Sequence, residues 1–288
     1  MQKQKTRIWQ LLQNKMRQFL APTMPDSQGN LTLTGKDFRY LHQVLRLRIG
    51  DAIHVRLPSG LLQTMAVSAV FGKSLILSPC QGAITQETGV TATQVEETHS
   101  HVRIPLWLFQ FMPKAQKLDV ILRQATELGV DKVIPVMGAH CQKDAVFQRS
   151  DRWERIIREA RQQSGSPVET VISTPLPLIE AMELWHELSQ SKLGIVLYEK
   201  SQDTQSFHQA VGQAKIEPKE TPDLVALVSG CEGGFSPEEI ETLKKNGFIP
   251  VHLDTNILRA ETATIYGLAV LQNLLTERPQ WLLNESTC

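Results

Sequence analysis

The sequence predicts an α/β protein of two domains, in which a small β-barrel precedes a larger domain built on a parallel sheet. Three observations predict this fold class. The chain has 288 residues, a length typical of about two domains. Up to residue 80, short apolar runs are separated by turn residues, as in a β-rich domain. After Arg103, apolar runs of strand length alternate with helical patterns, as in a parallel sheet covered on both faces.

The N-terminal part contains four short runs with strand composition, separated by turns such as Gly29-Asn30 and Pro58-Ser59-Gly60. One helix is expected between them, because Thr34 stands at a capping position before an apolar stripe. The stripe consists of Phe38, Leu41, Val44 and Leu45. The predicted strands are Leu31–Leu33, Ala52–Val55, Thr64–Val67 and Ser74–Leu77.

Composition also predicts where the domains begin and end. Residues 1–15 are polar with few apolar positions and are expected to form an extension holding at most one amphipathic helix. The barrel is predicted over residues 16–95 and the larger domain over residues 96–288. The boundary falls within residues 79–100, which are rich in Thr, Gln, Glu and Gly and resemble a linker.

The larger domain is expected to alternate strands and helices along its whole length. The predicted strands are Ile104–Phe111, Lys132–Met137, Glu169–Ile172, Leu193–Tyr198, Asp223–Ser229 and Phe248–Leu253. The predicted helices are Lys117–Leu128 with Gly129 as C-cap, Arg152–Gln163, Pro177–Leu188, Ser236–Lys245 and Glu261–Leu275.

Composition argues against several classes of protein. No apolar run approaches the roughly 20 residues of a membrane span, and the N-terminus lacks the pattern of a secretory signal, so a cytoplasmic protein is expected. The four cysteines form no CxxC pair, so neither a disulfide framework nor a metal site is expected. Residues 1–60 hold ten Lys/Arg against three Asp/Glu although the net charge is zero. This surplus indicates either nucleic-acid contact or a solvated charged face.

A glycine-rich loop, residues 230–235, follows a wholly apolar predicted strand. It leads into Ser236-Pro237-Glu238-Glu239, which has the pattern of a capping box with Pro at the first helical position. Glycines here would let the backbone approach a ligand, or would simply permit a tight turn. The loop is neither GxGxxG nor GxxxxGK[ST], so the common dinucleotide and P-loop interpretations fail.

A second polar loop, residues 253–262, follows the last predicted strand and leads into the last helix. Both loops are expected beyond the carboxyl ends of parallel strands, where α/β sheets bind ligands. Arg259 is predicted in the first helical turn, which is unfavourable for the helix dipole and favours a functional role. The alternative is a surface arrangement of Arg259 with Glu261.

Residues 228–263 resemble the C-terminal signature of the ribosomal RNA small-subunit uridine-N3 methyltransferase family, within the SPOUT class. The family pattern Gly-Pro-Glu-Gly-Gly-(Phe/Leu)-Ser matches residues 230–236, and Leu-Gly-x-x-Ile-Leu-Arg-x-Glu-Thr-Ala matches residues 253–263. Further similarity lies in residues 42–51, 117–135 and 152–165. The resemblance therefore covers nearly all of the chain from Met16 onward.

The resemblance implies a PUA-like barrel joined to a SPOUT α/β-knot domain with a C-terminal trefoil knot. It implies S-adenosyl-L-methionine as cofactor, 16S ribosomal RNA or the small ribosomal subunit as substrate, N3-methyluridine as product, and a homodimer. The residues expected to hold the cofactor are Leu197, Gly230, Glu232, Gly233, Gly234, Leu253, Ile257 and Leu258.

Three side chains are the candidates for catalysis. Arg259 is expected to stabilise charge on the uracil oxygens. Glu232 and Glu261 are alternative general bases for the N3 proton, and either could instead orient Arg259. Arg17, Arg46 and Arg48 are the candidates for contact with RNA phosphates, although a salt bridge on the barrel surface is an alternative for the last two.

Three positions depart from the family pattern. Cys231 replaces the usual Pro, Asp254 the usual Gly, and Ser166 an Arg that is frequent in the family. They leave two alternatives open. One is a SPOUT methyltransferase that acts on another RNA, and the other is a non-catalytic RNA-binding or assembly protein whose cofactor loop has decayed.

Overall fold

The computed structural model describes residues 18–80, 103–141, 150–188, 191–213 and 222–285. The chain divides into two compact units. The N-terminal unit contains residues 1–101 with 162–167, and the C-terminal unit contains residues 102–161 with 168–288. The predicted extension, residues 1–15, and the predicted boundary at residue 95 lie outside the described residues, so both stay predictions.

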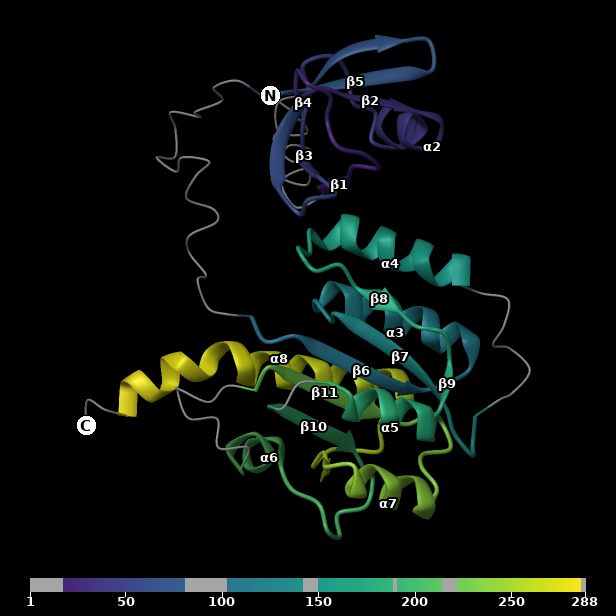
Figure 1. Ribbon diagram of the computed structural model, residues 1–288, viewed down its shortest axis with the longest axis vertical. Helices are drawn as coiled ribbons and strands as arrows, with labels where there is room; N and C mark the ends of the chain where they lie inside the picture. The colour runs from purple at the N-terminus through teal and green to yellow at the C-terminus, as the bar shows by residue number, and fades with distance from the viewer. Residues whose placement is uncertain (1–17, 81–102, 142–149, 189–190, 214–221, 286–288) are drawn as a thin grey trace. The chain divides into compact units, whose positions relative to one another are not determined.

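The N-terminal unit is a curled mixed sheet of five strands in the order β1-β3-β4-β5-β2 (Figure 1). Only β1 and β3 run parallel, and the other neighbours are antiparallel. A register shift between Val67 and Ala69 bends β4, as a bulge does in a curved sheet. The strands are β1 (Gln18–Leu20), β2 (Leu31–Thr34), β3 (Ala52–Arg56), β4 (Leu62–Phe71) and β5 (Ser74–Pro79). This arrangement confirms the β-rich, barrel-like architecture and all four predicted strands.

Within residues 18–80, the helical segment between β2 and β3 differs in detail from the prediction. It consists of α2 (Gly35–Phe38), which continues as the π-helix η1 (Arg39–Val44). Thr34 makes no side-chain capping bond, because it is still paired in β2. The Leu45 N–H donates to the Tyr40 carbonyl five residues back, and this wider turn rotates the apolar stripe. Val44 is consequently 67% exposed rather than buried.

The C-terminal unit is built on a seven-stranded, wholly parallel sheet. Its order is β12-β10-β11-β6-β7-β8, and β9 also pairs with β7. The strands are β6 (Leu106–Phe111), β7 (Lys132–Met137), β8 (Val171–Ile172), β9 (Leu176–Pro177), β10 (Lys192–Leu197), β11 (Leu224–Ser229) and β12 (Phe248–Val251). The predicted α/β class with a parallel sheet is confirmed. The trefoil knot stays a prediction.

Helices cover this sheet, so every residue of the central strand β11 is buried (Figure 1). The helices are α3 (Ala115–Glu127), α4 (Ser150–Ser164), α5 (Leu178–His186), α6 (Phe207–Gln213), α7 (Pro237–Lys245) and α8 (Ala260–Glu285). The five predicted helices are present. The sequence pattern missed α6 and β9 because both are too short to show periodicity. Among the described residues, no helix combines the length and apolarity needed to cross a membrane.

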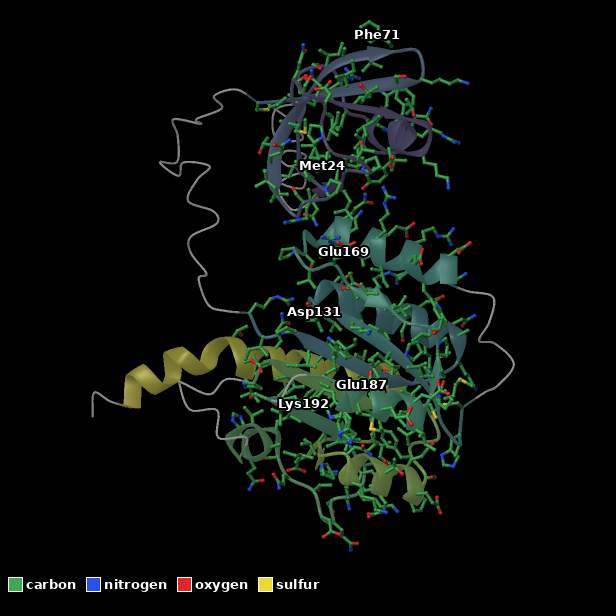
Figure 2. The ribbon with its side chains drawn as sticks, viewed as in Figure 1. Met24, Phe71, Asp131, Glu169, Glu187 and Lys192 are labelled. Atoms are coloured by element: carbon green, nitrogen blue, oxygen red, sulfur yellow. The ribbon has the colours of Figure 1, made fainter. Side chains whose placement is uncertain are left out.

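The amino edge of the parallel sheet carries tightly paired charges. Asp131, directly before β7, forms an ion pair with Arg103 and accepts the Leu106 N–H at 2.8 Å. Lys192, at the start of β10, donates to the Trp185 carbonyl and lies 4.8 Å from the centre of that indole ring. Figure 2 labels Asp131 and Lys192. These groups fasten loops and helix ends to the strands.

Candidate active site

A cavity of about 500 Å³ lies at the opposite, carboxyl edge of the same sheet. Strands β12, β10 and β11 are neighbours, so the loops that follow them lie side by side. The cavity is lined by residues 197–199, 229–235, 252–253 and 255–260 from these loops, together with Lys117 of α3 and Ala263 of α8. This is the position at which parallel α/β sheets bind ligands.

The glycine loop after β11 has the shape that its glycines permit. Gly234 has φ of 66°, in the left-handed region that favours glycine, and its N–H donates to the Cys231 carbonyl at 3.0 Å. A Cβ on Gly233 would lie 2.7 Å from the Cβ of His140. Beyond the loop, Ser236 and Glu239 form the predicted capping box of α7. The loop is thus held on the protein side and presents backbone to the cavity.

The loop between β12 and α8 presents exposed side chains to the cavity. Ile257 is 99% exposed although it is apolar. Arg259 lies directly before α8 rather than in its first turn, and its carbonyl accepts the Ala263 N–H at 2.8 Å. In the described part of the chain, no hydrogen bond or ion pair involves the Arg259 guanidinium. Asp254 does not have a positive φ, so replacing the usual glycine causes no backbone strain here.

A buried polar network fastens the two loops together beneath the cavity. Thr264 Oγ1 in α8 lies 2.9 Å from Gln110 Oε1 and 2.7 Å from Ser229 Oγ. Gln110 Nε2 donates to the carbonyls of Ser229 and Gly230 at 3.3 and 3.1 Å. All three polar side chains are almost completely buried. Since an unpaired buried polar group is costly, this network fixes the start of α8 against the glycine loop.

A lysine and two glutamates form a charged cluster beside the cavity. Lys117 Nζ lies 3.3 Å from Glu232 Oε1 and 3.2 Å from Glu261 Oε2. Burial disfavours the ammonium, but its ion pairs with Glu261 and Glu232 outweigh this effect and raise the pKa of Lys117. Burial likewise opposes ionisation of Glu232, yet backbone hydrogen bonds, including that from Lys114, and the Lys117 charge lower its pKa. Lys117 and Glu232 are therefore both charged at neutral pH.

Cys231 in the glycine loop contacts a second buried thiol, Cys141. A hydrogen bond from Cys141 lowers the pKa of Cys231 to about 6, against the opposing effect of burial. The same contact, together with burial, raises the pKa of Cys141. The Gly138 N–H also donates to Cys141 Sγ at 3.1 Å, so the loop before Cys141 is tied to this pair.

The structure brings nine of the residues predicted for the site together. These cavity-lining residues are Leu197, Gly230, Glu232, Gly233, Gly234, Leu253, Ile257, Leu258 and Arg259. Glu261 is the exception: its side chain is 20% exposed and binds Lys117, but it does not line the cavity.

The arginines predicted to bind RNA belong to the N-terminal unit. Arg46 and Arg48 are exposed there, and Arg46 has a positive φ of 57°. Arg17 lies outside the described residues. These three positions stay predictions.

Sequence reasoning missed Lys117, Gln110 and Thr264. Gln110 gave a signal, because a lone amide in the otherwise apolar run of β6 must find a buried partner. Lys117 gave no signal in the sequence. Its role depends on β6 lying next to β11, and the local sequence pattern does not show that these distant segments pair.

The fold and this cavity define the chain as an RNA methyltransferase: the family model of the RNA methyltransferase domain matches residues 100–272. More narrowly, the chain belongs to the ribosomal RNA small subunit methyltransferase E family. It is 30% identical over 195 residues to the protein of that name from Mycobacterium tuberculosis, covering 65% of this chain and 69% of the relative. It is 31% identical over 160 residues to the one from Aquifex aeolicus, covering 54% of this chain and 62% of the relative, less than two thirds of that protein.

Solved structures show the same fold. The ribosomal RNA small subunit methyltransferase E of Neisseria gonorrhoeae, bound to S-adenosyl methionine, superposes with a TM-score of 0.72 at 21% identity, covering 90% of this chain and 98% of that one. A methyltransferase of Legionella pneumophila in complex with the same cofactor gives a TM-score of 0.69 at 23% identity, covering 89% and 97%.

Proposed function

We propose that this protein transfers a methyl group from S-adenosyl-L-methionine to N3 of a uridine in 16S ribosomal RNA. The observation that carries the proposal is the cavity at the carboxyl edge of the sheet. It joins a glycine loop of open backbone to a loop whose arginine, Arg259, has no protein partner in the described chain. Family membership supports the reaction class and the RNA substrate.

The residues of the cavity fit a nucleoside cofactor. Its volume, about 500 Å³, lies in the range of small-molecule sites. The exposed side chain of Ile257 offers an apolar wall for a planar base. The backbone of Gly230, Gly233 and Gly234, together with Leu197 and Leu253, would hold the base and ribose. When bound, S-adenosylmethionine supplies an electrophilic methyl group on a sulfonium.

The chain's own residues position the uracil and manage its charge. N3 of uracil carries a proton near neutral pH, and its loss places negative charge on the flanking oxygens. Arg259 would stabilise that charge, because its guanidinium is exposed and unpaired in the described structure. Glu232 is the better candidate to accept the proton, since it lines the cavity whereas Glu261 does not. Its lowered pKa keeps it ionised and ready to accept a proton, although it makes the base weak.

Arginines of the N-terminal unit would bind the RNA backbone. Arg46 and Arg48, with Arg17, would contact phosphates and orient the RNA without reading its sequence. We further propose that the protein acts as a homodimer in the cytoplasm, where its ribosomal substrate is assembled. Binding through these arginines predicts an RNA affinity that falls as salt concentration rises.

The proposal is tested by mass spectrometry of 16S ribosomal RNA from a strain lacking this protein. The expected result is loss of one N3-methyluridine, restored by the wild-type chain but not by the Arg259→Ala variant. Persistence of the modification in the deletion strain would contradict the target. Calorimetry with S-adenosylmethionine tests the cofactor separately, and absence of binding would favour a non-catalytic RNA-binding protein.

A further inference from the structure

We propose that Lys117 is a positioning residue of this site, which holds Glu232 and Glu261 in ion pairs and thereby leaves Arg259 free for the RNA substrate. The inference rests on the function proposed above. It concerns a residue of α3, far in sequence from both loops that form the cavity.

Lys117 connects three separate elements of the C-terminal unit. Its ammonium lies 3.3 Å from the carboxylate of Glu232 in the glycine loop and 3.2 Å from that of Glu261 in the first turn of α8. The three side chains are only 20 to 30% exposed. One cation therefore serves two anions, where partial burial makes an unpaired charge more costly than it would be on an open surface.

The two carboxylates differ in what holds them besides Lys117. Glu232 also accepts the backbone N–H of Lys114, at 3.2 Å from Oε1 and 3.4 Å from Oε2. Glu261 Oε2 is buried and accepts no well-directed hydrogen bond, so the Lys117 ammonium is its charge partner. Removing that ammonium would leave Glu232 anchored and would release Glu261.

The nearest cation along the chain to a released Glu261 is Arg259, two residues earlier. Its guanidinium makes no hydrogen bond or ion pair with the described residues, and it faces the cavity. A freed carboxylate at the start of α8 would attract this guanidinium and compete with the RNA for it. By forming an ion pair with Glu261, Lys117 keeps Arg259 available to bind the RNA.

The test compares four variants of the full-length protein: Lys117→Met, Lys117→Arg, Lys117→Met with Glu261→Gln, and Lys244→Met. The first removes the charge while keeping much of the stem, and the second keeps the charge. The third also removes the competing carboxylate. Lys244→Met is the matched control, since Lys244 forms a 3.4 Å ion pair with Glu241 on α7, outside the cavity.

Binding of a 16S ribosomal RNA fragment is measured without cofactor, followed by kcat and KM for RNA and calorimetry with S-adenosylmethionine. Lys117→Met is expected to weaken RNA binding about three- to tenfold and to lower kcat/KM by about tenfold, the size of a lost charged contact. Its cofactor affinity should change by less than about threefold, as expected for one partly exposed ion pair. Lys117→Arg should retain most of the RNA affinity that Lys117→Met loses, because it keeps the charge. Lys244→Met should behave as wild type.

The decisive outcome is rescue by the second substitution. The double variant should recover most of the RNA affinity, because no carboxylate then competes for Arg259. If the ion pair between Lys117 and Glu261 only stabilised the fold, the double variant would not recover RNA affinity, since losing both partners cannot restore function. Wild-type RNA affinity in Lys117→Met, or a double variant no better than the single one, overturns the proposal. If the wild-type protein fails to bind S-adenosylmethionine, the proposed function fails instead.

Discussion

The two edges of the parallel sheet differ in how completely their charged groups are paired. At the amino edge, Asp131 pairs with Arg103 and Lys192 binds the Trp185 carbonyl. At the carboxyl edge, Arg259 has no partner among the described residues and Ile257 is 99% exposed. Both edges belong to the same strands, so the difference does not come from the fold. It shows that one edge is completed by the protein itself, whereas the other is left open for ligands.

Support for the open edge comes from beneath it. The network of Gln110, Ser229 and Thr264 is fully buried and hydrogen-bonded, so the loops above it start from fixed positions. A site with unpaired charged groups needs such a rigid base, because a mobile loop would allow those groups to pair with other groups of the protein. Substitutions at the two edges should therefore affect ligand binding and protein stability separately.

The largest effect is expected from Gly233→Ala. The added methyl group would lie 2.7 Å from His140 Cβ, so the glycine loop must shift. Overpacking of this kind costs about 1–3 kcal/mol, and we expect cofactor affinity to fall by roughly tenfold or more. Calorimetry with S-adenosylmethionine measures the change.

Gly212→Ala in α6 is the matched control, because a Cβ there would meet nothing within 4 Å. It should leave cofactor affinity unchanged. Equal affinity of the Gly233→Ala variant and the wild type would mean that the glycine loop does not form the cofactor site.

Thr264→Val should reduce both stability and binding. The substitution leaves Gln110 Oε1 and Ser229 Oγ without their buried partner, which costs about 1–3 kcal/mol. Thr276→Val is the control on the same helix. Thr264 Oγ1 lies 2.8 Å from the Ala260 carbonyl, and Thr276 Oγ1 lies 2.8 Å from the Gln272 carbonyl, but Thr276 is exposed. Urea denaturation of both variants gives the free energies of unfolding. Equal free energies of unfolding for the two variants would show that the buried network does not stabilise the protein.

Asp131→Ala should separate stability from binding. It removes the partner of Arg103 and of the Leu106 N–H, so the free energy of unfolding should fall by about 1–2 kcal/mol. Because this residue lies at the amino edge, the affinity for S-adenosylmethionine should match that of the wild type. A clear loss of cofactor affinity would contradict the claim that the amino edge takes no part in cofactor binding.

The smallest effect concerns the buried thiol pair. The pKa of Cys231 is lowered to about 6, mainly by the hydrogen bond from Cys141, so Cys231 should be a thiolate at pH 7.5, roughly the pH of ordinary assays. Cys141→Ala removes that bond and should raise the pKa, so the thiolate forms only at higher pH. Titration of the ultraviolet absorbance of the thiolate measures the shift, and identical curves for the two proteins would exclude the coupling.

Local patterns predicted most of the fold. Strands β6, β7, β10 and β11 are runs of buried apolar residues, and the capping box of α7 is visible in four consecutive letters. The π-helix η1 was missed, because a change from four- to five-residue hydrogen bonding leaves no mark in composition. The exposure of Val44 follows from that single change.

The candidate site was predictable only where it lies within a loop. The glycine loop and the segment before α8 each stand out along the chain. Lys117 does not, because its ion pairs depend on three elements that meet only in the folded sheet. Conversely, the pattern gave Glu261 the same rank as Glu232, whereas only Glu232 lines the cavity.

The central claim is that the open carboxyl edge holds the cofactor, and hydrogen exchange measured by mass spectrometry tests it most directly. The full-length protein is compared with and without S-adenosylmethionine. We expect slower amide exchange with the cofactor in residues 230–235 and 253–259, and no change around Asp131 and Lys192. Protection at the amino edge, or equal exchange rates in both loops with saturating cofactor, would contradict the central claim.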